Sequence, residues 1–133
     1  MFDKELRVGL EAVDKAMLIS RKIQAELTDQ DKLDKSDKSP VTIADFASQA
    51  IICSILHDSF PNIPIVGEEE SKDLRKPENN TILRKIEHFL KKESNLFDSL
   101  YEKDIFKSID LGCGIPSDDI FWTLDPIDGT KGF

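Results

Sequence analysis

The most informative stretch of the sequence is Ile120-Phe121-Trp122-Thr123-Leu124-Asp125-Pro126-Ile127-Asp128-Gly129-Thr130. Its apolar beginning predicts a buried strand over residues 120–124, which delivers Asp125 at its end. The proline turns the chain, Asp128 follows three residues later, and Gly129 and Thr130 would open a helix. Two carboxylates beside a helix N-terminus suit a divalent cation and a phosphate group. A plain turn followed by a capped helix explains the same residues without any function.

A second group of acids follows another short apolar run. Residues 63–66 predict a short strand that ends at Gly67, and Glu68, Glu69 and Glu70 come directly after it. Three adjacent glutamates repel one another unless a cation or solvent lies between them. The segment therefore fits either a cation site or a solvated run of charge.

A third acid lies near the start of a predicted helix over residues 43–57. Thr42 and Asp45 have the spacing of a capping box, and Pro40 stands just outside. An acid in the first helical turn also stabilises the helix dipole, so Asp45 has a structural explanation. The three segments together favour a metal site. Layered α/β folds assemble divalent metal sites from acids that lie at strand ends and are far apart in the sequence.

The remaining pattern indicates a helix-rich domain. Residues 3–28 predict an amphipathic helix whose expected core stripe consists of Leu6, Leu10, Val13, Ala16, Met17, Ile23 and Leu27. The polar residues 29–39 predict a mobile loop, and residues 78–92 a third helix. Residues 93–118 show no readable periodicity, and Gly112-Cys113-Gly114 is interpreted as a flexible loop.

Composition excludes several classes of protein. With 133 residues the chain fits one domain, and a net charge of −8 argues against binding a nucleic-acid polymer. Two cysteines and two histidines do not form a zinc motif. No apolar run is long enough to span a membrane, and the N-terminus lacks a signal-peptide pattern, so a cytoplasmic location is expected. A phosphate-binding loop motif is also absent.

Three motifs together resemble the inositol monophosphatase superfamily. Residues 125–130 match its D-P-[ILM]-D-G-[ST] signature, residues 66–69 its G-E-E segment, and residues 40–45 its V-T-x-x-D segment. Residues 130–133 and 35–42 are most similar to the branch that hydrolyses 3′(2′),5′-bisphosphate nucleotides. The long connection between Glu68 and Asp125 is typical of the same branch.

The resemblance implies a fold and a chemistry. The expected fold is α/β (α+β layered), with N-terminal helices packed on an antiparallel sheet, as in inositol-phosphatase-like sugar phosphatases. The expected reaction is Mg²⁺-dependent hydrolysis of a phosphomonoester, 3′-phosphoadenosine 5′-phosphate above all, with sensitivity to Li⁺. An inositol-phosphate phosphatase and an inactive piece that only binds metal or a partner are the alternatives.

The resemblance also assigns roles to individual residues. The metal ligands would be Glu68, Asp125, Asp128 and the carbonyl of Ile127. Glu68 and Thr130 would hold the attacking water, with Asp45 as a further acidic partner, and the backbone at Gly129 and Thr130 would bind phosphate. Asp37 lies on the polar loop that closes on the site in the family.

One departure from the family concerns length. Family members continue well past the Asp125–Thr130 signature into a C-terminal half that carries a further aspartate ligand and base-contacting residues. Residues 1–133 are therefore expected to be the N-terminal part of a phosphatase domain, truncated before the site is complete. A complementary C-terminal chain is a possible partner.

Overall fold

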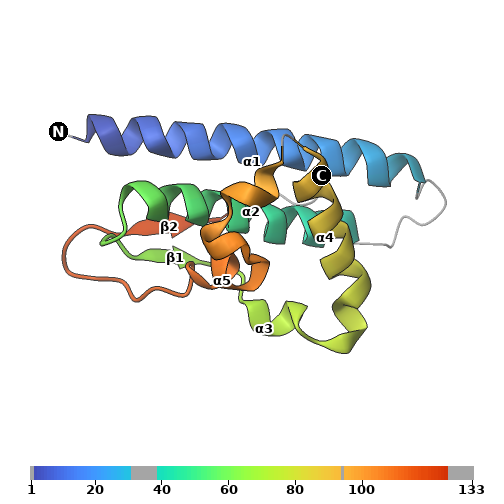
Figure 1. Ribbon diagram of the computed structural model, residues 1–133. Coiled ribbons are helices and arrows are strands. Elements are labelled where there is room, and N and C mark those ends of the chain that lie inside the picture. The colour runs from blue at the N-terminus through green and yellow to red at the C-terminus, as the bar shows by residue number, and fades with distance from the viewer. Residues whose placement is uncertain (1, 31–38, 94, 126–133) are drawn as a thin grey trace.

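The computed structural model describes residues 2–30, 39–93 and 95–125 (Figure 1). Helices dominate this part of the chain, and the strands are short. In chain order the elements are α1 (Asp3–Gln30), α2 (Ser39–Ser59), β1 (Ile65–Gly67), α3 (Ser71–Leu74), the 3₁₀-helix η1 (Pro77–Asn79), α4 (Asn80–Lys92), the 3₁₀-helices η2 (Leu96–Ser99) and η3 (Tyr101–Lys103), α5 (Ile105–Asp110) and β2 (Trp122–Leu124).

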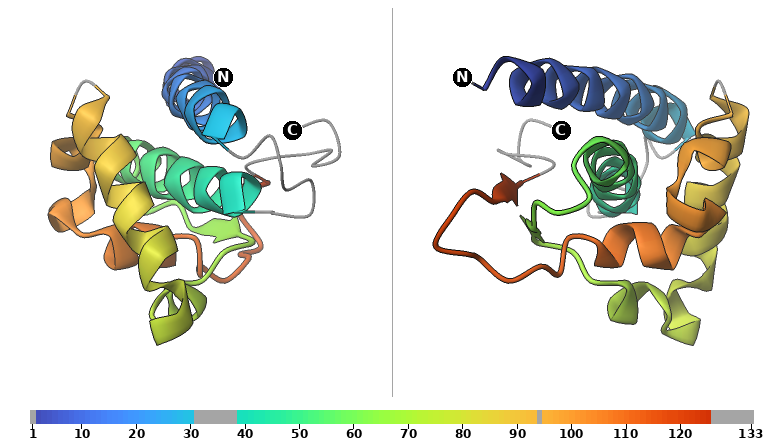
Figure 2. Two further views of the ribbon diagram at one scale, coloured as in Figure 1. Left: turned by 90° about the vertical axis from the view of Figure 1, so that its right-hand side faces the viewer. Right: turned by 60° about the vertical axis from the view of Figure 1, so that its left-hand side comes forward.

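Helix α2 forms the centre of the molecule. It is apolar around most of its circumference, and a helix of that kind is stable only when other elements surround it. Figure 2 shows α1 along one side, the two strands along another, and α4 and α5 along a third. The core is therefore built around one helix, rather than between helices and a broad sheet.

The core divides into two clusters along α1. The C-terminal half of α1 packs with α2, α4 and α5 through residues that include Ile19, Ile23, Ile43, Ile86 and Ile109. The N-terminal half of α1 packs against the C-terminal half of α2 and against β1. The residues of this second cluster are Val8, Ala12, Ala16, Ile52, Cys53, Leu56 and Ile65. The second cluster joins the strands to the helices. Of the two cysteines, Cys53 is buried in it and Cys113 is exposed.

The predicted core stripe of α1 is wrong for four of its seven residues. Leu6, Leu10, Val13 and Met17 are between 45% and 63% exposed, whereas Ala16, Ile23 and Leu27 are buried. The helix carries two apolar stripes about a third of a turn apart, and spacing alone fits either. Packing selects the stripe with small side chains at Ala12 and Ala16, because small residues let α1 approach α2 closely.

Helix α2 begins earlier than predicted. It starts at Ser39 rather than near Ile43, so Thr42 lies inside the helix and is not its cap. Pro40 occupies the first turn, where a missing backbone N–H costs nothing because that group has no partner within the helix. Of the expected loop over residues 29–39, the first two residues belong to α1 and Ser39 belongs to α2, and residues 31–38 lie outside the described residues.

The two strands correct the expected antiparallel sheet. β1 and β2 pair in parallel, with Ile65 opposite Trp122, Val66 opposite Thr123 and Gly67 opposite Leu124. Parallel pairing requires a crossover connection, and residues 68–121 supply one that contains α3, α4 and α5. The same crossover explains most of the region that shows no periodicity, because its helices η2, η3 and α5 are each too short to produce a pattern.

The segment around Cys113 is anchored, not flexible. Val66 and Cys113 form an antiparallel bridge on the edge of β1 away from β2. The Gly67 N–H donates to the Gly112 carbonyl at 2.7 Å, and the Gly114 N–H donates to the Ile65 carbonyl at 2.8 Å. A side chain at 114 would place its Cβ 2.6 Å from that carbonyl oxygen, so this close approach requires glycine.

Strand β2 is less buried than its apolar sequence predicts. The strand covers Trp122–Leu124 only, and Thr123 is exposed. The Trp122 ring lies beside Gly9 of α1, and its centroid is 6.1 Å from that of Phe60. These contacts attach β2 to α1 along one side of the helix.

Candidate metal and phosphate site

The parallel register brings two of the predicted site acids to one edge of the sheet. Gly67 and Leu124 are paired, so both strands end at the same level. Glu68 and Asp125 are the next residues of their strands, and both are exposed. Carboxyl ends of parallel strands are where open sheets assemble binding sites.

Asp45 faces the same edge from helix α2. Burial raises the pKa of its carboxyl to about 7, and the charges of Glu69, Glu68 and Asp125, in that order, add to the effect. Charges act on one another strongly only over short distances. Asp45, Glu68, Glu69 and Asp125, which come from three segments far apart in the sequence, are therefore near enough for their charges to affect the Asp45 carboxyl.

Glu69 belongs to this cluster, whereas Glu70 does not. Glu69 is half-buried, and burial followed by the charge of Glu68 raises its pKa. Glu70 points to solvent and forms an ion pair with Lys72 at 3.0 Å. The run of three glutamates is thus divided between a half-buried acid near Asp45 and an acid on the solvated surface.

The remaining predicted site residues lie outside the described residues. These are Asp37, Ile127, Asp128, Gly129 and Thr130. Over residues 2–30, 39–93 and 95–125, no group of three His, Cys, Asp or Glu side chains is close enough to hold a metal by itself. The donor chemistry nevertheless fits Mg²⁺, because Asp45, Glu68 and Asp125 supply hard carboxylate oxygens whose crowding a divalent cation would relieve.

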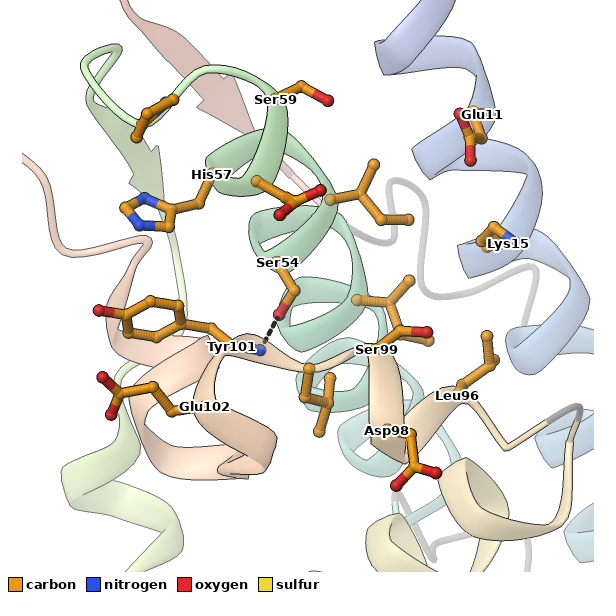
Figure 3. Close-up of a pocket in the computed structure, with 15 residues that line it drawn as sticks. Glu11, Lys15, Ser54, His57, Ser59, Leu96, Asp98, Ser99, Tyr101 and Glu102 are labelled. Carbon is orange, nitrogen blue, oxygen red and sulfur yellow. Dashed lines mark hydrogen bonds between the residues drawn. The ribbon is translucent and has the colours of Figure 1, made fainter.

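A hollow adjoins Asp125 on the side of α1. Its volume is about 300 Å³, and its lining includes Val13, Met17, Arg21, Leu124 and Asp125. A cavity of about 910 Å³ lies elsewhere, at the C-terminal end of α2 beside η2 and η3 (Figure 3). His57, Tyr101 and Glu11 line that larger cavity, and none of the strand-end acids does. The cavity of about 910 Å³ and the strand-end acids therefore lie in different parts of the molecule.

Sequence reasoning missed Gln49, which is fully buried one turn after Asp45. Its side chain bonds both backbone groups of Glu69. The available signal was a long polar side chain within the apolar run from Phe46 to Ile52, on the same face of α2 as Asp45. A polar residue in such a place has bonds to satisfy, and the pattern alone does not say where they go.

Comparison with known proteins places the chain in one family. The family model for inositol monophosphatases matches residues 3–133. The chain is 41% identical over 145 residues to 3′(2′),5′-bisphosphate nucleotidase 2 of Candida albicans, covering 99% of this chain and 40% of the relative. It is 38% identical over 144 residues to 3′(2′),5′-bisphosphate nucleotidase of Schizosaccharomyces pombe, with the same coverage of both chains.

A plant relative is similar over the same region. It is the putative mitochondrial 3′(2′),5′-bisphosphate nucleotidase of Arabidopsis thaliana, which is 36% identical over 142 residues and covers 99% of this chain and 34% of the relative. The chain thus spans about two fifths or less of the length of these curated relatives. Among the described helices, none combines the length and apolar character needed to cross a membrane.

Proposed function

The chain belongs to the inositol monophosphatase family, and we propose that it carries the metal-binding part of a Mg²⁺-dependent phosphomonoesterase acting on 3′-phosphoadenosine 5′-phosphate. The observation that carries the proposal is the convergence of Glu68, Asp125 and Asp45 at one sheet edge. Enzymes of this family are metal-dependent and typically use Mg²⁺. The curated relatives bear the name of a nucleotidase, which favours that substrate over an inositol phosphate.

Each acid has a distinct proposed task. Glu68 and Asp125 would hold the cation, together with Asp128 and the carbonyl of Ile127. When bound, Mg²⁺ would neutralise phosphate oxygens and lower the pKa of water. Asp45, whose pKa lies at about 7 without metal, can exchange a proton near neutral pH.

The phosphate and the attacking water would be held by the residues that follow Asp125. Backbone N–H groups at Gly129 and Thr130 would face the phosphate, as at other helix N-termini. The Thr130 hydroxyl and Glu68 would orient the water for direct attack on phosphorus, without a covalent phosphoenzyme. Asp37 would add an acid from the segment between α1 and α2. A cytoplasmic location remains a prediction.

The metal proposal is tested on the chain itself with Mn²⁺ as a probe in place of Mg²⁺. Electron paramagnetic resonance measures free Mn²⁺ in the presence of wild type, Glu68→Gln, Asp125→Asn and Glu70→Gln. The first two variants should weaken binding at least tenfold, while melting temperatures without metal stay equal or rise because repulsion is relieved. Glu70→Gln is the matched control and should bind as wild type does. Equal weakening by all three variants would reject the assigned ligands.

The substrate proposal is tested on a polypeptide as long as the curated relatives. The chain would be extended by the sequence that follows the matched region in the Candida albicans relative. The extended protein is offered 3′-phosphoadenosine 5′-phosphate and inositol 1-phosphate in parallel, and kcat/KM is compared. A tenfold preference for inositol 1-phosphate, about 1.4 kcal/mol of transition-state binding, would overturn the nucleotidase assignment and leave the metal chemistry standing.

A further inference from the structure

The Gln49 side chain joins three segments of the chain at the candidate site. Its Nε2 donates to the carbonyl of Glu69 at 2.8 Å and to the carbonyl of Ile109 at 2.8 Å. Its Oε1 accepts from the Glu69 N–H at 3.0 Å. The amide is fully buried, and these bonds use both of its donors and its acceptor. We call this set of bonds the Gln49 clasp.

Two glycines make room for the clasp. A Cβ at Gly67 would lie 2.7 Å from Oε1 of Gln49, and a Cβ at Gly112 would lie 2.6 Å from its Nε2. Neither distance is tolerated between non-bonded atoms, so the backbone on both sides fits closely around this amide. The same two glycines bond each other through the Gly67 N–H and the Gly112 carbonyl at 2.7 Å.

We propose that Gln49 is a positioning residue, which sets where the end of β1 presents Glu68 relative to Asp45; this inference rests on the proposed function. Gln49 and Asp45 lie one turn apart on one rigid helix. The clasp bonds the peptide group that links Glu68 to Glu69. Helix α2 therefore carries one acid of the site itself and fixes the backbone of the next.

A purely structural role is the competing explanation, because any buried hydrogen bond contributes to stability. Ser54 provides the matched control. It lies on the same helix, is 4% exposed, and its Oγ donates to the Ala50 carbonyl and accepts from the Tyr101 N–H at 3.0 Å (Figure 3). It is thus a buried polar link from α2 to another segment, beside the larger cavity and away from the strand-end acids.

The experiment compares Gln49→Met and Ser54→Ala in the chain by two readouts. Amide hydrogen exchange by NMR follows the Glu69 N–H, and electron paramagnetic resonance follows Mn²⁺ binding per folded molecule. Gln49→Met should speed Glu69 exchange and raise the Mn²⁺ concentration for half-saturation at least tenfold. Ser54→Ala should change both by less than twofold. Equal loss of Mn²⁺ binding in the two variants would overturn the proposal.

Two further measurements cover the cases in which Gln49→Met does not fold or the wild-type chain binds no Mn²⁺. If Gln49→Met does not fold, Gly112→Ala displaces the same amide and should move both readouts in the same direction by threefold or more; no change would overturn the proposal. If the wild-type chain takes up no Mn²⁺, the proposed metal function fails. Exchange at Glu69 then decides the clasp alone, since faster exchange in Gln49→Met supports it and unchanged exchange overturns it.

Discussion

The ends of β1 and β2 bring acids to the same edge, yet they are held in different ways. β1 pairs with β2 on one edge and with Cys113 on the other, and the Gln49 clasp fixes the residues just after it. Within the described residues, β2 pairs with β1 only, and the buried Trp122 Nε1 has no hydrogen-bond partner there. Glu68 is therefore placed by strand register, by Gln49 of α2 and by the segment that follows α5, whereas the backbone before Asp125 is placed by its pairing with β1.

This difference implies that substitutions at the two strand ends change the stability of the chain by unequal amounts. A strand end held from several sides transmits a small steric change to everything that touches it, because packed interiors have little free volume. The end of β2 keeps the side-chain contacts of Trp122 with Gly9 and Phe60 but has backbone bonds on one edge only among the described residues, so it can shift or absorb such a change more easily. The largest effects of substitution are expected at β1 and the smallest beside β2.

Gly67→Ala should give the largest loss. The new Cβ would meet Oε1 of Gln49 at 2.7 Å, and overpacking of this kind costs about 1–3 kcal/mol in the free energy of unfolding. Urea unfolding followed by circular dichroism measures the change. Thr123→Ser, at an exposed position of β2, is the control and should stay within about 0.5 kcal/mol of wild type. Similar losses in both variants would contradict the asymmetry.

Asp45→Asn should change the pH dependence of stability in metal-free buffer. The Asp45 pKa is about 7 in the folded chain and 3.8 as its ordinary value, so unfolding releases a proton between these pH values. Stability therefore falls as pH rises from about 4 to 7. The variant should melt higher than wild type at pH 7.5 and equally at pH 3.5. The same difference in melting temperature at both pH values would contradict the assignment.

The pKa of Asp45 also allows a direct comparison of the two strand ends. Among the charges that raise the Asp45 pKa, Glu69 and Glu68 have larger effects than Asp125. The Asp45 pKa measured by NMR should thus fall further in Glu69→Gln than in Asp125→Asn. The reverse order would place the end of β2 nearer to α2 than the end of β1.

Met17→Gln should give the smallest effect. Met17 is 45% exposed and lines the hollow beside Leu124, so a polar side chain there loses little burial. The free energy of unfolding should change by no more than about 0.5 kcal/mol. Ile19→Val, on the buried stripe of the same helix, should cost about 0.5–1.5 kcal/mol by the same urea assay. A larger loss of unfolding free energy in Met17→Gln than in Ile19→Val would favour the core stripe expected from the sequence.

Local patterns predict the parts of this fold that depend on neighbouring residues. The helical periodicity of residues 3–28 and 78–92 indicates α1 and α4, and the apolar run before Gly67 indicates β1. The strand-end location of Glu68 and Asp125 is also confirmed, because a strand followed by a turn is a local feature. The grouping of these acids with Asp45 in one metal site stays a prediction from three motifs, and the charge effects on the Asp45 pKa support it.

Features that depend on distant partners were not predictable in the same way. The choice between the two stripes of α1 depends on how closely α2 approaches, and the direction of β2 depends on the path of the crossover. Gly112 resembles a loop residue until β1 is placed beside it. Gln49 has the same character, since its three bonds reach residues 20 and 60 positions away in the sequence.

The reactivity of the two cysteines can be used to measure local opening of this chain. Burial, followed by the nearby Cys113 thiol, raises the pKa of Cys53 to about 12; partial burial, followed by the charge of Asp110, also raises the pKa of Cys113, but that residue is exposed. Alkylating reagents attack thiolates, so Cys113 is modified in the native chain and Cys53 only when the cluster between α2 and β1 opens. The ratio of the two labelling rates reports how often the support beneath the strand-end acids comes apart, without any engineered probe.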